Sequence, residues 1–179
     1  MNQKVVAFTG ISGVGKTTFL RKLAERIDFQ HVTGGSLIAA ARAAAPGSRD
    51  AIRYANLDEN QILLVKGFLL ARDRKSNLVV MDGHVIIDDG AALSKISSEV
   101  FKALGVTVMA HLECTPERIA QNRIEDKSRA RPTYPSSTLQ RHQEISRTHA
   151  QAIATMLGVP FYSVTHNDVN WLARHLVAE

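Results

Sequence analysis

Eight residues near the start of the chain have the types and the spacing of a phosphate-binding loop. Gly10-Ile11-Ser12-Gly13-Val14-Gly15-Lys16-Thr17 fits the pattern G-x-x-x-x-G-K-[ST], which predicts a site for a nucleoside triphosphate. Glycines let the backbone curl so that its N–H groups point at phosphate oxygens. The Lys16 ammonium adds positive charge at the β- and γ-phosphates, and the Thr17 hydroxyl is placed to bind Mg²⁺.

The elements on either side of the loop support this interpretation. Residues 4–9 are an apolar run rich in β-forming residues, and residues 15–27 have helical spacing, so a strand enters the loop and a helix leaves it. The helix turns the positive end of its dipole toward the same anion. The alternative, an ordinary glycine-rich turn, is disfavoured by this context. The residues expected to contact ATP here are Gly10, Ile11, Ser12, Gly13, Val14, Gly15, Lys16, Thr17 and Thr18.

A carboxylate at the end of a second apolar run is the next candidate. Residues 78–81 read Leu-Val-Val-Met and are followed by Asp82. An aspartate in this position matches the second nucleotide-site motif of phosphate-loop proteins, in which it holds Mg²⁺, usually through water. The alternative is that Asp82 caps the next turn together with Gly83.

Arginines are concentrated in a third segment. Arg123, Arg129, Arg131 and Arg147 are candidates for stabilising a phosphoryl group in transfer, which needs positive charge and the exclusion of water. Residues 129–135 interrupt two helical patterns and resemble a loop that could close over a ligand. The alternative, a solvated basic surface, is our interpretation of Arg118, Arg141 and Arg174.

Length and composition bound the class of protein. The chain has 179 residues, 45% of them hydrophobic and 22% charged, which is ordinary for a globular domain. One cysteine, no signal peptide and no apolar run long enough to span a bilayer predict a soluble, cytoplasmic protein. The net charge of +5 suits a polyanion, and nucleotides account for it without a nucleic-acid or membrane partner. Nothing in the sequence points to an oligomeric state.

Strand-like and helix-like segments alternate along the chain. Strands are expected at 4–9, 77–82, 106–113 and 159–164, with a weaker one at 31–33. Helices are expected at 15–27, 58–75, 94–104, 115–126, 136–157 and 168–177. This alternation predicts an α/β fold with a mainly parallel sheet covered on both faces.

Together these segments resemble the nucleoside monophosphate kinase group of phosphate-loop proteins, in particular archaeal-type adenylate kinase and its bacterial relatives. The resemblance covers nearly the whole chain. The matching segments, in order, are Thr9–Thr18, the helical segment 49–53, the helix from Leu57, Met81–Ile86, Arg129-x-Arg131-x-x-Tyr134, and Arg147.

The resemblance implies a three-layer fold with a five-stranded parallel sheet, formed by one kinase domain over residues 1–179. It also implies an acceptor-binding segment over about 31–75 and a lid over about 123–135. The implied activity is reversible phosphate transfer from Mg²⁺-ATP to a nucleoside monophosphate, most simply ATP + AMP = 2 ADP. Lys16 and the lid arginines would stabilise the moving group, Thr17 and Asp82 would organise Mg²⁺, and His166 and Asn167 would lie beside the ATP base.

The acceptor side departs from the pattern of common adenylate kinases. They carry Asp-Gly-Phe-Pro-Arg, whereas this chain continues from Asp82 and Gly83 to His84, Val85 and Ile86, without the arginine. His84 could meet the acceptor or could be satisfied by neighbouring backbone. The residues expected at the acceptor site are Gly35, Ser36, Arg42, Arg49, Arg53 and His84.

Two other functions remain open at this point. The same scaffold could phosphorylate another small acceptor, or it could be an ATP-binding switch or ATPase associated with RNA or protein. A signalling GTPase is disfavoured, because the guanine motif Asn-Lys-x-Asp does not occur.

Overall fold

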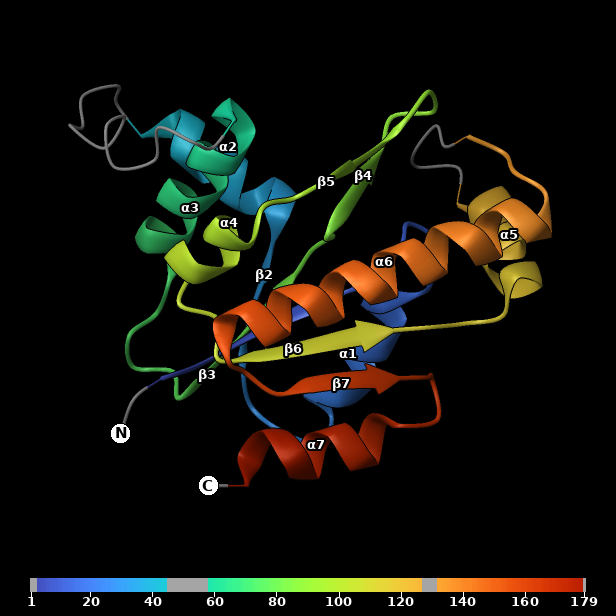
Figure 1. Ribbon diagram of the computed structural model, residues 1–179. Coiled ribbons are helices and arrows are strands. Elements are labelled where there is room, and N and C mark those ends of the chain that lie inside the picture. Colours follow the sequence, from blue (N-terminus) through green and yellow to red (C-terminus); the bar gives the residue numbers. More distant parts are fainter. Residues whose placement is uncertain (1–2, 45–57, 127–131, 179) are drawn as a thin grey trace.

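The computed structural model describes residues 3–44, 58–126 and 132–178. A five-stranded parallel sheet forms its centre, in the order β2-β3-β1-β6-β7 (Figure 1). The strands are β1 (Lys4–Thr9), β2 (Gln30–Thr33), β3 (Leu78–Asp82), β6 (Val108–Leu112) and β7 (Phe161–Val164). The three central strands read as continuous apolar runs because both faces of the sheet are covered.

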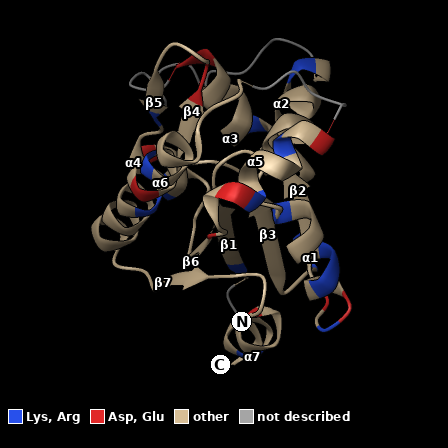
Figure 2. Ribbon diagram, turned by 90° about the vertical axis from the view of Figure 1, so that its right-hand side faces the viewer, with Lys and Arg blue, Asp and Glu red and all other residues tan. Residues whose placement is uncertain are grey.

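Helices cover both faces of this sheet, which confirms the predicted fold class. The helices are α1 (Lys16–Ala24), α2 (Gly34–Ala43), α3 (Glu59–Ala71), α4 (Ser98–Ala103), α5 (Pro116–Glu125), α6 (Ser136–Leu157) and α7 (Val169–Val177). The helices α1 and α7 lie on one face, and α6 lies across the other (Figures 1 and 2). The helices α2 and α3 pack on each other near the β2 edge.

Two segments differ from the sequence-based expectation. Residues 94–104 were predicted as one helix, but β4 (Ile86–Asp88) and β5 (Leu93–Lys95) form an antiparallel hairpin, and α4 begins only at Ser98. The Ser97 hydroxyl caps α4 by accepting from the Glu99 N–H. The apolar residues between 96 and 104 do have helical spacing, but the helix begins only after the cap at Ser97.

Helix α2 is the second difference, since no helix was predicted for Gly34–Ala43. Two glycines at its start are poor helix formers. A capping box compensates, because Thr33 Oγ1 accepts from the Ser36 N–H and Ser36 Oγ accepts from the Thr33 N–H. The helical segment expected at 49–53 lies outside the described residues.

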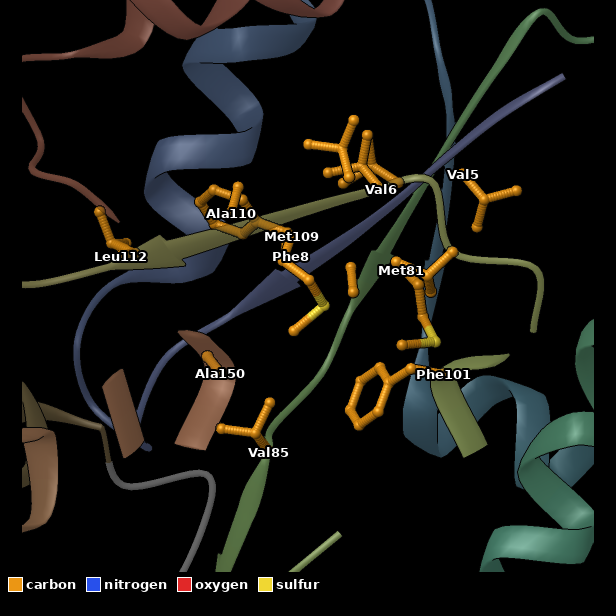
Figure 3. Packing of buried hydrophobic residues seen from close by; sticks show 14 of the residues in the cluster. Val5, Val6, Phe8, Met81, Val85, Phe101, Met109, Ala110, Leu112 and Ala150 are labelled. Carbon is orange, nitrogen blue, oxygen red and sulfur yellow. The ribbon is translucent and has the colours of Figure 1, made fainter. Parts of the chain in front are cut away.

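The buried core fixes the central strands against the helices. Figure 3 shows Val5, Met81, Met109, Phe101 and Ala150 among the side chains that fill it. Thr9 ends β1, Asp82 ends β3 and His111 is the second-last residue of β6, so these polar side chains come at the sheet edge where ligands bind in open α/β sheets. Within the described residues, no helix combines the length and the apolar character that a bilayer crossing requires.

Candidate functional site

The phosphate-loop residues form the turn between β1 and α1. Gly13 and Gly15 have positive φ values of 91° and 93°, a region that glycine adopts without strain. Space is also restricted, because a Cβ on Gly13 would lie 2.7 Å from Arg123 Cγ and one on Gly15 would lie 2.8 Å from the His166 ring. Both dihedral angle and packing therefore require glycine here.

Lys16, the first residue of α1, is held inside the site and is only 8% exposed. Its ammonium donates to the Gly10 carbonyl at 3.0 Å, and lies 3.3 Å from His84 Nε2 and 3.9 Å from Asp82 Oδ1. No side chain caps the N-terminus of α1, whose N–H groups follow Gly15. The ammonium and the positive end of the helix dipole thus act on the same region.

Asp82 ends β3 beside two basic side chains, those of Lys16 and His31. Its side chain is 13% exposed, with Oδ1 3.9 Å from Lys16 Nζ and Oδ2 3.9 Å from His31 Nε2. Asp82 also lines the large cavity described below, and its role as a Mg²⁺ ligand remains a prediction. His31 was not identified from the sequence, because its approach to Asp82 depends on the pairing of β2 with β3.

The donor set at this point fits Mg²⁺. Thr17 and Asp82 line the same cavity and offer hard oxygen atoms. Among the residues described, no group of three His, Cys, Asp or Glu side chains could hold a metal ion alone. Proteins commonly supply only one or two oxygens to Mg²⁺, which keeps water and phosphate as its other ligands, so the roles of Thr17 and Asp82 stay a prediction.

One cavity of about 720 Å³ joins the loop to the helices α2 and α3. On the loop side it is lined by Ser12, Gly13, Gly15, Lys16, Thr17, Thr18, Asn122 and Asp126. On the far side it is lined by Thr33, Gly34, Gly35, Ile38, Asp58, Asn60, Gln61 and Leu64. Asp82 and His84 line it as well. A triphosphate and a second molecule can therefore meet in one continuous space.

The predicted acceptor residues are only partly brought together. Gly35 and His84 line the cavity. Ser36 instead uses its side chain in the capping box of α2. Arg42 does not line the cavity, but its Nη2 donates to Oδ1 of the cavity residue Asn60 at 3.4 Å. Arg49 and Arg53 lie outside the described residues.

The predicted catalytic arginines do not all lie at the phosphate loop. Arg123 contacts the loop, where its Nε donates to the Ser12 carbonyl at 2.9 Å and its side chain is 6% exposed. Arg147 pairs with Glu113 instead, at 3.7 Å between Nη1 and Oε2, and lines neither this cavity nor the smaller one described below. Arg129 and Arg131 lie outside the described residues.

The segment after β7 packs against the outside of the loop. His166 Nε2 lies 2.8 Å from the Val14 carbonyl, which makes it the donor, and its ring lies near Phe19. The Asn167 N–H donates to Thr165 Oγ1. Neither His166 nor Asn167 lines the large cavity, so a contact with the ATP base remains a prediction.

Asn122 is a loop contact that the sequence reasoning missed. Its Nδ2 donates to the Gly13 carbonyl at 2.8 Å. The signal was the helical spacing of Ile119, Asn122 and Arg123, which places them on one face of α5 toward the loop.

Comparisons with known proteins give the following matches. A family model described as "AAA domain" matches residues 9–140. The chain is 30% identical over 156 residues to an adenylate kinase of Pyrococcus abyssi, covering 84% of this chain and 80% of that protein. It is 28% identical over 163 residues to an adenylate kinase of Thermoplasma acidophilum, covering 89% and 88%. A solved shikimate kinase from Acinetobacter baumannii in complex with shikimate has a TM-score of 0.58 at 18% identity, covering 98% and 92%, a likeness of fold.

Proposed function

We propose that this chain, which belongs to the AAA domain family and to the nucleoside monophosphate kinase group of phosphate-loop proteins, transfers a phosphoryl group from ATP to AMP, giving two ADP. The observation that carries this proposal is the continuous cavity between the phosphate loop and the helices α2 and α3. It offers one end to a triphosphate and the other to an acceptor, as direct transfer requires.

The donor side supplies charge and orientation. The Lys16 ammonium and the N–H groups at the start of α1 bind the β- and γ-phosphates and stabilise charge that develops during transfer. The Arg123 guanidinium, at the Ser12 carbonyl, adds a fixed positive charge at the edge of the loop. Thr17 and Asp82 would hold Mg²⁺, which neutralises phosphate charge when bound with ATP. Arg129, Arg131 and Arg147 remain proposals for this role.

The acceptor side of the cavity combines polar and apolar side chains. Asn60 and Gln61 provide amide groups that can hydrogen-bond to the edge of a base, and Ile38 and Leu64 provide apolar contacts to its face. The acceptor phosphate needs a cationic anchor. We assign that role to Arg42, Arg49 or Arg53; Arg42 already contacts the cavity residue Asn60.

A panel of acceptors with ATP and Mg²⁺, read by the phosphorylated product, tests this function. AMP should be the preferred acceptor, and Arg42→Ala, Arg49→Ala or Arg53→Ala should raise the KM for AMP far more than that for ATP. Arg26→Ala is the matched control, because Arg26 is exposed and donates to Asn170 away from the cavity. An absence of AMP phosphorylation, or three unchanged KM values for AMP, would contradict the AMP assignment.

A second candidate is a kinase for a small uncharged hydroxyl compound. Among the described residues that line the large cavity, Lys16 is the only Lys or Arg, which favours an acceptor without its own phosphate. Asp82, which lines the cavity together with His84, would then accept the hydroxyl proton. Phosphorylation of a nucleoside or polyol in the same panel would support this candidate, and ADP formation without any acceptor would instead indicate an ATPase.

A further inference from the structure

Asp88, at the end of β4, is the centre of a polar cluster that lies outside the predicted site. Its Oδ1 accepts from the Tyr134 hydroxyl at 2.9 Å and from the Gly90 N–H at 3.0 Å. Its Oδ2 faces two bases, at 4.0 Å from Arg123 Nη1 and 3.8 Å from His142 Nδ1. One oxygen is thus fixed by neutral donors, and the other is directed at the basic groups. Figure 2 shows acidic residues at this hairpin.

Arg123 is the strongly charged member of the cluster. Burial lowers the pKa of His142, although Asp88 raises it, so the imidazole is the weaker cation. The Arg123 guanidinium remains charged at any ordinary pH, is 6% exposed and lies over the Tyr134 ring at 5.7 Å. Its Nε and Nη1 donate to the carbonyls of Ser12 and Pro132, at 2.9 and 3.2 Å. A buried guanidinium bound to neutral carbonyls is stabilised by a nearby anion, and Asp88 supplies it.

The cluster borders the nucleotide site directly. Asp88, Arg123 and His142 line a second cavity of about 260 Å³ between the phosphate loop and the hairpin β4–β5. This cavity shares Ser12, His84 and Ile87 with the large one. Asp88 thus approaches the guanidinium from the hairpin, an element that contributes no residue of the phosphate-loop motif.

We propose that Asp88 is a positioning residue for phosphoryl transfer, because its carboxylate holds the Arg123 guanidinium against the phosphate loop at Ser12. This role of Asp88 rests on the proposed function in one respect, since it requires that Arg123 acts on the transferred phosphoryl group. The opposite arrangement, in which Asp88 withholds Arg123 from the phosphates, predicts a gain of activity when the carboxylate is removed, so the two are separable by experiment.

The test uses Asp88→Asn, which keeps the size and the acceptor for Tyr134 but removes the charge. The kcat should fall about tenfold while the KM for ATP changes little, because a donor that acts in the transition state is displaced. Asp89→Asn is the matched control: Asp89 is adjacent and exposed, and its carboxylate accepts from the Ala91 and Ala92 N–H groups. In an Arg123→Lys background, Asp88→Asn should have little further effect on kcat.

A second measurement does not depend on the acceptor. The affinity for ADP with aluminium fluoride and Mg²⁺, measured by calorimetry, should fall about tenfold in Asp88→Asn while that for ADP alone is retained. If no acceptor is phosphorylated by the wild-type chain, the proposed function fails while this measurement still tests Asp88. Tyr134→Phe, which removes one donor to Asp88, should show a smaller loss of the same kind.

Three outcomes would overturn the proposal. They are an unchanged or increased kcat and analogue affinity in Asp88→Asn, an equal loss in Asp89→Asn, and a full additional loss when Asp88→Asn is combined with Arg123→Lys. If Asp88→Asn strongly lowers the melting temperature, the Tyr134→Phe variant tests the proposal instead. A purely structural role of Asp88 would leave the affinity of Tyr134→Phe for the analogue unchanged.

Discussion

The Lys16 ammonium lies 3.9 Å from the Asp82 carboxylate, although the two residues belong to separate sequence motifs. One follows the loop after β1, and the other ends β3, and the parallel pairing of these two strands brings them together. Each charge is little exposed, so each stabilises the other within the cavity. Replacing one of them therefore affects both the phosphate contact and the proposed Mg²⁺ ligand, so the effects of the two substitutions should be compared.

Lys16→Ala should abolish most phosphoryl transfer. The ammonium supplies transition-state charge stabilisation, so a loss of ~10²-fold or more in kcat is expected. Lys22→Ala is the matched control, because Lys22 is exposed on the same helix. Steady-state kinetics give the effect, and circular dichroism checks the fold; near-normal turnover in the variant would remove Lys16 from the mechanism.

Asp82→Asn should change the dependence on Mg²⁺ specifically. The amide lacks the charge of a carboxylate and is a weaker ligand for a hard cation, so half-maximal activity should need about tenfold more Mg²⁺. Asp28→Asn, an exposed aspartate away from the cavity, serves as the control. A magnesium titration of activity that coincides with that of the wild type would return Asp82 to the role of a turn residue.

The sequence was most informative where the signal is local. The phosphate loop occupies consecutive residues, and Asp82 is marked by the apolar strand before it, so both could be placed without knowing the fold. The contacts of Asp88, Asn122 and His31 could not be predicted in this way. Each of their partners is distant in the chain and is brought close by strand pairing or helix packing. The hairpin β4–β5 was missed because its strands are three residues each, too short for an alternating pattern.

Gly67→Ala should separate the two helices that border the acceptor side. A Cβ on Gly67 would lie 1.8 Å from the Leu37 carbonyl oxygen, so the backbones of α2 and α3 must move apart. The free energy of unfolding should fall by about 1–3 kcal/mol, and the KM for the acceptor should rise more than that for ATP. Leu70→Ala, at a side chain that is 62% exposed on α3, should change stability by less than about 0.5 kcal/mol. Equal stability of the two variants by chemical denaturation would contradict this packing.

His111 should make the fold sensitive to acid. Its pKa is lowered from 6.5 to about 3, first by burial and then by the positive charges of Lys16 and Arg147, and its Nδ1 lies 2.8 Å from Thr9 Oγ1. Below pH 6.5 the unfolded chain binds a proton that the folded chain does not, so the free energy of unfolding falls as the pH drops toward 3. The slope from this residue is roughly 1.4 kcal/mol per pH unit.

Denaturation between pH 7 and pH 5 measures this slope. In His111→Gln the free energy of unfolding should depend less steeply on pH, whereas His175→Gln, at an exposed histidine of α7, should keep the steep dependence. Identical slopes in the wild type and His111→Gln would contradict the assignment. The C2–H resonance of His111 in the folded wild type should also stay unchanged down to pH 5.

The backbone contact between Gly67 and Leu37 has a practical consequence for observing the acceptor side. Helix α2 begins with Gly34 and Gly35 in the cavity wall, and it cannot slide along α3 without displacing the turn of α3 that contains Gly67. We therefore expect α2 and α3 to move together as one rigid unit. A fluorescent dye attached to a cysteine introduced at position 70, which is exposed on α3 and does not line the cavity, should then report acceptor binding without contacting the acceptor.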